Sequence, residues 1–465
     1  MNSRASFLYQ LFLRHFPYEP TSCQDALLES TATFLTSDDG DILVVNGYAG
    51  TGKTSTVAAL VSGLKELGIN SILLAPTGRA AKVLAQYAGQ PASTIHKHIY
   101  RQKSLGSDGF GEFSLSFNKA HGALFIVDEV SLISIGQDNN FGSGNLLEDL
   151  VAFVRSGTDC RLILIGDAAQ LPPVGLDASP ALSKPFMNAF GGVQYATLST
   201  VVRQAADSGI LGNATRLRNL LPYQGQPLGL IPEKDVERIG GGELLEALSD
   251  AYGRYGEDEV AVLCRSNKRA GRYNAGIRNS VLFHEERLVR GERLMIVKNH
   301  YLDTLEGTDY IANGDMAKLV WIKHFEERYG LHFADACLSF PDYGDQEVEM
   351  KVLLDTLESD TPSLPYEQSQ ALYQGVLADY AHLSTKKKRY DAVREDAFFN
   401  ALQIKYAHAI TCHKAQGGQW RCVFIDNPFW QEPLAEEEVK WLYTALTRAT
   451  EKVYLVNFRE SCFNK

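Results

Sequence analysis

The feature that most constrains the fold is a glycine-rich loop set between an apolar run and an amphipathic stretch. Residues 41–46 read DILVVN, residues 47–54 read GYAGTGKT, and residues 53–67 carry apolar side chains at helical spacing. A strand that enters a helix through G-x-x-x-x-G-K-[ST] is the pattern of a phosphate-binding loop. Its glycines let backbone N–H groups turn toward phosphate oxygens, and the helix N-terminus adds positive potential. The loop therefore predicts a nucleotide-phosphate site at the end of a buried strand.

Further apolar runs repeat this strand-then-helix pattern along the first part of the chain. They read SILLAP at 71–76, ALFIVDE at 123–129 and RLILIGD at 161–167. Such alternation predicts an α/β fold in which a parallel sheet carries helices on both faces. Because ligands bind at the carboxyl ends of parallel strands, the polar residues that follow these runs are the candidate site residues.

The length and pattern of the chain predict more than one domain. One hydrophobic core rarely serves more than about 250 to 300 residues, and this chain has 465. A second alternation begins at 259–281 and resumes at 401–420, and the residues between them read as short strands followed by a charged helical stretch. We expect a first α/β domain over 1–195, a second over 196–284 and 396–465, and an insertion over 285–395.

A smaller insertion is expected in the first domain, over about residues 98–121. Asp108-Gly109 lies there between polar and alternating segments, which is typical of a β-hairpin turn. From the residues alone, a hairpin that decorates the surface fits this pattern as well as one that contacts a ligand.

Composition narrows the classes of protein. The net charge is -11, the seven cysteines include no CxxC pair, and no apolar run approaches the roughly 20 residues that span a bilayer. These features predict a soluble, cytoplasmic protein with reduced thiols, no membrane partner and no structural metal. The acidic balance weighs against a nucleic-acid partner unless one groove concentrates the basic side chains.

Polar residues after the apolar runs form a candidate catalytic set. Lys53 is placed to reach β- and γ-phosphate oxygens, and Thr54 to ligate Mg²⁺. Asp128 and Glu129 suit a metal ligand and a general base for water, although such a pair can also simply start a helix. Gln170 follows the next strand, where it is either a sensor of the γ-phosphate or a turn residue beside two prolines.

Two distant arginines and one glutamine complete the candidate nucleotide site. Arg203 lies in LSTVVRQ and Arg448 in LYTALTRAT, both far downstream of the loop. An arginine supplied from a facing domain stabilises charge on a transferring phosphoryl group and couples hydrolysis to domain closure. A surface arginine on each helix is the alternative. Gln24, on a helix before the first strand, is a candidate for reading a base edge.

Taken together, the motifs resemble those of superfamily-1 DNA helicases. In chain order they are GYAGTGKT, LLAPTGRAAKVL, STIH, FIVDEVSLI, LIGDAAQLPPVG, LSTVVRQ, ITCHKAQGGQW and YTALTRAT. The resemblance is strongest to class B, the RecD-like and Dda-like enzymes, and extends from Gln24 to Arg448. It implies two RecA-like P-loop motor domains, with a small β-hairpin insertion in the first and an SH3-like β-rich insertion in the second.

The resemblance also implies which residues act, with ATP and Mg²⁺ bound between the two domains and single-stranded DNA across their tops. The implied catalytic residues are Lys53, Asp128, Glu129, Gln170, Arg203 and Arg448, and the implied metal ligands are Thr54 and Asp128. The implied nucleotide contacts are Gln24, Gly47, Ala49, Gly50, Thr51, Gly52, Lys53, Thr54, Thr56 and Gly417. The implied DNA contacts are Pro76, Thr77, Arg79, Thr94, His96, Thr411 and His413, together with Phe110 and Phe113 stacked on the bases at a fork.

The implied function is an ATP-dependent DNA helicase that moves 5′ to 3′ on single-stranded DNA and unwinds forked duplex, with a replication or repair protein as a further partner. An RNA-directed translocase and a non-unwinding nucleotide-driven switch or loader are the alternatives. Two departures from the family pattern concern coupling, because Ala415 stands where many relatives have serine and Gln419-Trp420 replaces a commoner acidic residue. The stretch from about 345 to 400 is either a clamp for DNA or a partner, or a solvated helical pair.

Overall fold

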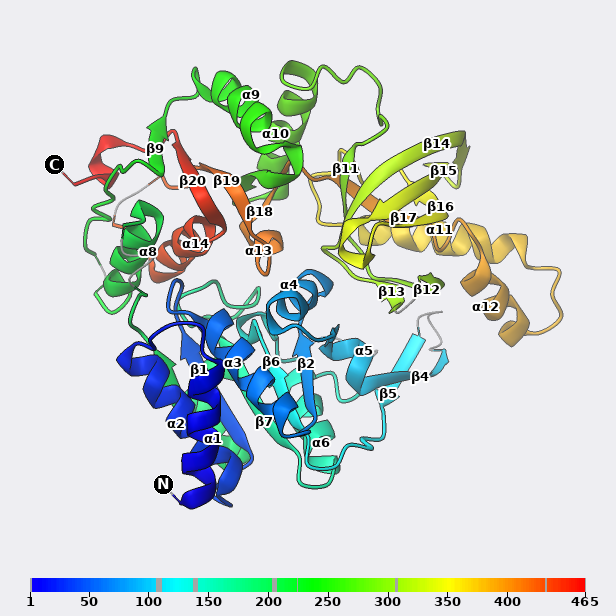
Figure 1. The fold of residues 1–465 in the computed structure, drawn as a ribbon. Helices are drawn as coiled ribbons and strands as arrows, with labels where there is room; N and C mark the ends of the chain where they lie inside the picture. The colour runs from blue at the N-terminus through cyan, green and yellow to red at the C-terminus, as the bar shows by residue number, and fades with distance from the viewer. Residues whose placement is uncertain are drawn as a thin grey trace.

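Two parallel sheets and a closed β-barrel form the framework of the computed structural model (Figure 1). The structure describes residues 2–105, 111–136, 141–202, 207–223, 225–305, 308–430 and 433–464. Within these residues each parallel sheet belongs to one α/β domain, which confirms the fold class predicted from the alternating runs. The barrel projects from the second domain, and the two termini lie on the opposite side of the molecule from it.

The first domain is built on a six-stranded parallel sheet. β1 lies between β7 and the edge strand β8, so the phosphate loop leaves the sheet from a buried strand that is paired on both sides. Phe12 and Leu60 belong to the core on one face of the sheet, and Leu150 and Phe153 to the core on the other. In sheet order the strands are β3 (Ala92–Thr94), β2 (Ser71–Ala75), β6 (Leu124–Val127), β7 (Arg161–Gly166), β1 (Ile42–Gly47) and β8 (Val193–Leu198). The helices are α1 (Ser3–His15), α2 (Ser22–Thr36), α3 (Lys53–Glu66), α4 (Gly78–Ala88), α5 (Ile95–Ile99), α6 (Leu146–Ser156) and α7 (Lys184–Met187).

The second domain repeats this architecture with five parallel strands. Leu217 and Leu442 pack on one face of its sheet, and Leu248 and Ile277 on the other. In sheet order the strands are β18 (Ala409–Thr411), β10 (Val260–Cys264), β19 (Trp420–Asp426), β20 (Ala449–Val456) and β9 (Val236–Ile239). The helices are α8 (Gly209–Leu220), α9 (Leu244–Tyr255), α10 (Asn267–Ser280), α13 (Cys412–Ala415) and α14 (Glu436–Leu446).

Four of the five barrel strands and two helices lie in the region predicted as an insertion. Two helices, α11 (Tyr366–Asp379) and α12 (Lys386–Glu395), form the stretch whose role the sequence left open. Leu372, Val376 and Val393 of these helices pack with Phe333 and Leu353 of the barrel strands, so the helical pair covers the outside of the barrel. The barrel strands are β11 (Arg293–Ile296), β14 (Met316–Arg328), β15 (Leu331–Phe340), β16 (Gln346–Leu353) and β17 (Leu402–Tyr406).

Two short antiparallel strand pairs extend toward one another, one from the first domain and one from the barrel region (Figure 1). The first pair is β4 (Tyr100–Leu105) with β5 (Gly111–Leu115), and the second is β12 (His300–Leu305) with β13 (Thr308–Ile311). The first pair lies where the sequence predicts a hairpin. Its predicted turn at Asp108-Gly109 is outside the described residues.

Two expected domain boundaries need correction. The boundary after residue 195 falls inside β8, which pairs with β1 through Leu198 and so belongs to the first sheet. The boundary after residue 395 precedes β17, which pairs with β11 and β16 to close the barrel. Apolar runs show where strands are, but the pairing partner that assigns a strand to a sheet is set by tertiary contacts.

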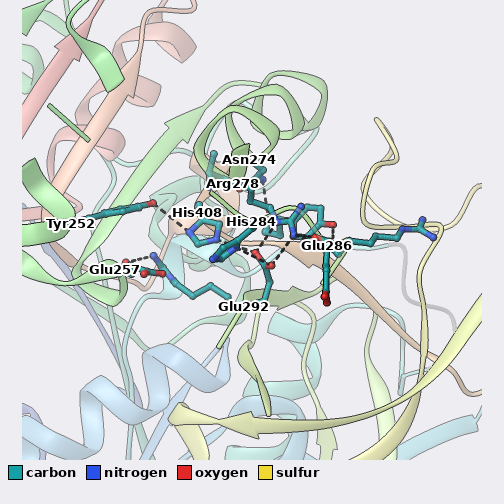
Figure 2. A network of polar contacts seen from close by, with 12 residues as sticks. Tyr252, Glu257, Asn274, Arg278, His284, Glu286, Glu292 and His408 are labelled. Atoms are coloured by element: carbon teal, nitrogen blue, oxygen red, sulfur yellow. Dashed lines mark hydrogen bonds and ion pairs between the residues drawn. The ribbon is translucent and has the colours of Figure 1, made fainter. Parts of the chain in front are cut away.

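A buried polar network joins the barrel to the second domain (Figure 2). The Glu292 carboxylate, just before β11, is fully buried and accepts hydrogen bonds from Arg278 Nε at 3.0 Å and Nη2 at 3.1 Å. His408 Nε2 lies 3.3 Å from the same carboxylate, and its Nδ1 lies 3.4 Å from the Tyr252 hydroxyl. Burial alone would raise the pKa of Glu292, but hydrogen bonds from His408 and Arg278 lower it. An ionised carboxylate therefore fixes the base of the barrel against α10.

Two findings bear on the expectations drawn from composition. All seven cysteines are free thiols, and all except Cys23 are buried, in agreement with the predicted reduced core thiols. Among the helices that the structure describes, none has both the length and the apolar character needed to cross a membrane.

Candidate nucleotide site and strand-facing surface

The phosphate loop has the backbone geometry that its sequence predicts. Gly50 and Gly52 have positive φ values of 71° and 77°, and Gly52 is the N-cap residue that immediately precedes α3. A Cβ on Gly52 would lie 2.2 Å from Gln24 Nε2, so glycine is required by both conformation and space. Lys53 Nζ donates to the carbonyl oxygens of Gly47 at 2.6 Å and Tyr48 at 3.1 Å. The Lys53 ammonium is therefore held inside the loop, and Thr54 is exposed at the start of α3.

Gln24 braces the phosphate loop from α2. Its side chain is 2% exposed, and its Nε2 donates to the Thr51 carbonyl oxygen at 3.0 Å. Its Oε1 accepts from the Thr21 N–H at 2.8 Å, which completes the N-terminal capping box of α2. The structure thus places Gln24 beside the loop, as its predicted nucleotide role requires, and holds its amide in one orientation.

The two carboxylates after β6 differ in environment. Asp128 accepts hydrogen bonds from the Tyr87 hydroxyl and from the Glu129 N–H, the latter at 2.8 Å. Glu129 has a φ of 54°, a left-handed conformation that non-glycine residues rarely adopt and that clusters at functional sites. Burial raises the pKa of the Glu129 carboxyl, and the neighbouring Asp128 raises it further. A strained, proton-binding carboxyl suits a general base, and the oxygen ligands that Asp128 and Thr54 offer are those Mg²⁺ prefers.

The loop that follows β7 leaves the first domain and enters the core of the second. Ala169 and Leu171 belong to the same hydrophobic cluster as the helices of the second domain. The Leu171 N–H donates to Thr444 Oγ1 at 2.8 Å, and the Leu171 carbonyl accepts from Gln416 Nε2 at 2.8 Å. Gln170 lies between Ala169 and Leu171, and its Oε1 is buried and has no hydrogen-bond partner among the described residues. Buried acceptors are rarely left unpaired, so the predicted sensor residue has capacity for a donor that binding would bring.

Arg448 lies in the second domain with its guanidinium unpaired by any carboxylate among the described residues. It is 4% exposed and donates to the carbonyl oxygens of Thr444 and Gly418, each at 3.2 Å. Its charge nevertheless acts on Glu129 of the first domain, as does that of Lys53. Arg203, the other predicted arginine finger, lies outside the described residues.

Among the residues predicted to contact single-stranded DNA, two threonine side chains cap the starts of helices. Thr77 Oγ1 accepts from the Ala80 N–H and Thr94 Oγ1 from the Lys97 N–H, at the starts of α4 and α5. Pro76 is half-buried immediately before the first of these caps. Gly417, predicted near the nucleotide, packs against α4, where an added Cβ would lie 3.4 Å from Thr77 Oγ1. The two domains therefore meet directly at the predicted strand-binding motifs.

Arg79 contacts the second domain rather than open solvent. Its guanidinium lies 4.2 Å from the centroid of the Trp420 ring and donates to the Gln419 carbonyl at 3.2 Å. A Cβ on Gly418 would lie 2.8 Å from Arg79 Nε, so the close approach depends on that glycine. The residue pair 419–420, noted above as a departure from the family pattern, is thus the surface that receives Arg79.

Aromatic packing occupies two of the predicted DNA contacts. The Phe113 ring stacks on Phe141 with centroids 4.5 Å apart, and the His96 ring meets Phe141 edge-on at 5.1 Å. Burial lowers the pKa of His96 to about 4, so its imidazole is neutral at physiological pH. One face of Phe113 is therefore taken by the protein, and Phe110 is outside the described residues.

The remaining predicted strand contacts lie at the end of β18. Thr411 precedes α13, and its side chain makes no cap hydrogen bond to that helix. His413 is half-buried, and burial lowers its pKa. The neighbouring Lys414 donates to Asn313 Oδ1 of the barrel, and burial lowers its pKa to about 8. The barrel also reaches α4, where Lys82 pairs with Asp342 at 3.4 Å, so it borders this surface on both domains.

Sequence reasoning missed the residues that join the domains around the phosphate loop. Tyr443 Oη lies between the two domains and contacts both Ala49 and Asp167, and Thr444 and Gln416 hold Leu171. Tyr443 and Thr444 stand in the quoted segment YTALTRAT and Gln416 in ITCHKAQGGQW. A polar side chain inside an otherwise buried helix was the available signal, but it does not identify a partner far away in the chain.

Comparisons with known proteins agree with this geometry. The AAA domain family matches residues 24–219, and the UvrD-like helicase C-terminal domain family matches residues 406–456. The ATP-dependent RecD2 DNA helicase of Deinococcus radiodurans is 35% identical over 193 residues, which are 41% of this chain and 24% of that protein. The ATP-dependent DNA helicase dda of Enterobacteria phage T4 is 25% identical over 447 residues, 89% of this chain and 94% of its own.

The relatives differ in how much of their length is shared. An uncharacterized protein of Methanocaldococcus jannaschii is 23% identical over 448 residues, and the match covers 36% of it. The chain thus spans about a third of that relative and about a quarter of the RecD2 protein. A solved structure of Pif1 helicases, described for DNA unwinding at forked duplex, aligns over 96% of this chain and 94% of the Pif1 chain with a TM-score of 0.50 and 15% identity. At that identity the likeness concerns the fold.

Proposed function

We propose that the chain is a RecD-like and Dda-like helicase of superfamily 1 and that it hydrolyses ATP to move along single-stranded DNA. Movement runs 5′ to 3′ and separates the duplex ahead of it. One observation carries the proposal: the helix that precedes Arg448 is hydrogen-bonded to the first domain beside the phosphate loop, through Tyr443 to the Ala49 N–H at 2.9 Å and through Thr444 to the Leu171 N–H at 2.8 Å. Because the groups that complete the site come from two domains, turnover is coupled to their relative position.

The residues of the cleft have separate chemical roles. Lys53 and the loop N–H groups bind the phosphates, and Glu129 accepts a proton from the attacking water. Arg448 neutralises charge that develops on the transferring phosphoryl group. Thr54 and Asp128 would hold Mg²⁺, which would supply positive charge against the phosphates. Arg203 joins Arg448 in this role, and Gln170 orients the water or reads the γ-phosphate.

Strand movement follows from alternating grip on the two domains. Thr77, Thr94 and His96 contact the strand from the first domain, and Thr411 and His413 from the second. Caps at helix starts and neutral imidazoles suit sugar and phosphate contacts that do not read sequence. When ATP closes the cleft, the two sets approach one another, and hydrolysis separates them again.

Forked DNA substrates test the proposal. A duplex with a single-stranded 5′ tail should be displaced in the presence of ATP and Mg²⁺, and the same duplex with a 3′ tail should not. The Lys53→Ala variant is the control for contaminating activity. Displacement from the 3′-tailed substrate alone would refute the polarity, and DNA-stimulated hydrolysis without displacement would favour a switch or loader.

An RNA-directed translocase is the second candidate, because backbone contacts to a single strand distinguish the two sugars weakly. ATPase stimulation by DNA and RNA oligonucleotides of one sequence separates the two. We expect stronger stimulation by DNA, and the reverse order would reassign the substrate.

A further inference from the structure

The hydroxyl of Tyr443 connects the phosphate loop, the loop after β7 and the second domain through one atom. Tyr443 lies on α14 and is 1% exposed. Its hydroxyl donates to Asp167 Oδ2 at 2.6 Å and accepts from the Ala49 N–H at 2.9 Å. Ala49 is the third residue of the phosphate loop, and Asp167 directly follows β7. No other side chain of the second domain hydrogen-bonds to a phosphate-loop N–H among the described residues.

The direction of these hydrogen bonds is fixed by chemistry. Burial and the Asp167 charge raise the pKa of Tyr443, so its hydroxyl keeps its proton over the whole working range. Asp167 Oδ1 already accepts from the Ala169 N–H at 2.9 Å, and the second oxygen takes the tyrosine proton. The hydroxyl oxygen is then an acceptor toward Ala49. The Ala49 N–H is therefore occupied by protein, although N–H groups of this loop are the ones that bind phosphate.

We infer that Tyr443 is a positioning residue that reports the occupancy of the phosphate loop to the second domain. In the free protein its hydroxyl takes the Ala49 N–H. A nucleotide that carries a β-phosphate claims that N–H and releases the hydroxyl from the loop. This inference rests on the proposed ATP-driven function and names the contact through which nucleotide binding reaches α14.

The position of Tyr443 gives its release a consequence at Gln170. Thr444, the next residue of α14, accepts from the Leu171 N–H, and Asp167 accepts from Tyr443 itself. The loop that carries Gln170 is thus held at both ends by adjacent residues of one helix. When phosphate displaces the Tyr443 hydroxyl, α14 and this loop can move together relative to the phosphate loop, and Arg448 follows Thr444 by four residues on the same segment.

The Tyr443→Phe substitution tests the inference, because it removes the hydroxyl and keeps the ring. Without the competing hydrogen bond, ATPγS and ADP should bind about threefold to tenfold more tightly in the presence of Mg²⁺, and AMP should bind as it does to the unaltered protein. The ratio of ATP turnover with single-stranded DNA to turnover without it should fall at least threefold, because the loop and α14 are no longer coupled. Equal affinity for ATPγS, or an equal gain for AMP, would overturn the inference.

Tyr273→Phe is the matched control. Tyr273 is also in the second domain and its hydroxyl donates to a carboxylate, Asp426 Oδ1, at 2.7 Å, but it does not contact the phosphate loop. This variant should keep the nucleotide affinities and the DNA stimulation of the unaltered protein. If it matches Tyr443→Phe in both measurements, the effect is a general loss of a tyrosine–carboxylate hydrogen bond and the inference fails.

Hydrogen exchange tests the same contact without relying on a variant that must fold. In the unaltered, nucleotide-free protein the Ala49 amide should be protected from exchange, and rapid exchange there would contradict the inference. The proposed function fails separately, because it fails when the unaltered protein neither binds nor hydrolyses ATP. A protein that hydrolyses ATP but shows no change in Tyr443→Phe keeps the function and loses only this inference.

Discussion

The two domains contact one another in two places. One is beside the phosphate loop, here called the phosphate side, and the other is beside the residues predicted to bind single-stranded DNA, here called the strand side. On the phosphate side, Tyr443 and Thr444 make short hydrogen bonds to backbone N–H groups, of 2.9 and 2.8 Å. On the strand side, the Arg79 guanidinium lies over the Trp420 ring, 4.2 Å from its centroid, and Gly418 allows the close approach. The hydrogen bonds depend strongly on direction. The attraction between the Arg79 guanidinium and the Trp420 ring persists when the two groups shift relative to one another.

This difference suits the tasks that the two sides would have. A hydrogen bond is lost steeply when its geometry changes, so it distinguishes an occupied phosphate loop from an empty one. A cation–π contact and a glycine surface tolerate sliding, so the strand side can change its spacing without separating. Variants on each side should therefore alter different measured quantities.

The largest effect is expected at Lys53. The Lys53→Ala variant should lower ATP turnover by at least about 10³-fold, because it removes the charge that binds and stabilises the phosphates. Affinity for single-stranded DNA should stay within about twofold, since among the described residues the Lys53 ammonium hydrogen-bonds to the phosphate loop alone. Steady-state ATPase assays and fluorescence anisotropy with a labelled strand measure the two. A parallel loss of DNA affinity would show that the two sides are not separable.

Arg448 should separate chemistry from binding within the phosphate side. In Arg448→Ala, turnover should fall by on the order of 10³-fold, because transition-state charge loses its counterpart. ATPγS affinity should change little. Arg448→Lys keeps the charge but not the planar guanidinium, and it should recover only part of the rate. Normal ATP turnover in Arg448→Ala would show that Arg448 does not take part in hydrolysis.

Glu292 tests whether the strand side depends on the barrel. Glu292→Ala leaves Arg278 buried without its partner and should lower the free energy of unfolding by about 3 kcal/mol, measured by urea denaturation. Because hydrogen bonds lower the pKa of Glu292 in the folded state, its contribution is complete above the ordinary carboxyl pKa and is lost as pH falls through the lower folded value.

The same Glu292→Ala variant should weaken DNA binding more than ATPγS binding, because Lys414 and Lys82 contact the barrel on the strand side. A variant as stable as the unaltered protein would show that the network does not anchor the barrel. Equal losses of both ligands would instead show that the barrel also supports the phosphate side.

Trp420 should show a smaller effect that is confined to coupling. Trp420→Leu removes the ring beneath Arg79 and should lower DNA-stimulated turnover about threefold to tenfold, with basal turnover nearly unchanged. Trp430→Leu is the control, because that ring is 84% exposed. If both variants behave alike, the loss is not specific to the Arg79 contact. A fall in basal turnover with Trp420→Leu would place this residue functionally on the phosphate side.

The smallest effect is expected from the pH dependence of His96. Burial lowers its pKa to about 4, so the folded protein binds fewer protons here than the unfolded chain between about pH 4 and 6.5. The contribution of His96 to stability is therefore present above pH 6.5 and is lost as pH falls toward 4. Between pH 6 and 8, the DNA affinity difference between the unaltered protein and His96→Gln should vary by less than about twofold. A difference that grows toward pH 6 would indicate a charged imidazole at the strand.

Local patterns predicted much of the fold and the list of candidate residues. Glycines at 50 and 52 have the positive φ that the loop motif requires, and Asp128 and Glu129 end a buried strand as the apolar run predicts. These features depend on neighbours within a few residues, where strand periodicity, glycine conformation and helix capping act. The domain bounds were less accurate, because β8 and β17 are assigned by their pairing partners.

The contacts between domains were decided only by the tertiary structure. The Ala49 N–H and the Tyr443 hydroxyl are 394 residues apart, and Arg79 reaches the Gln419 carbonyl across 340. Neither pair has a periodicity that a sequence pattern can express. The sequence by itself determined two α/β domains and a phosphate loop, because these arise from local conformation and apolar burial. Which polar atoms face one another across the cleft depends on how two completed domains pack, and only the folded chain brings those atoms within bonding distance.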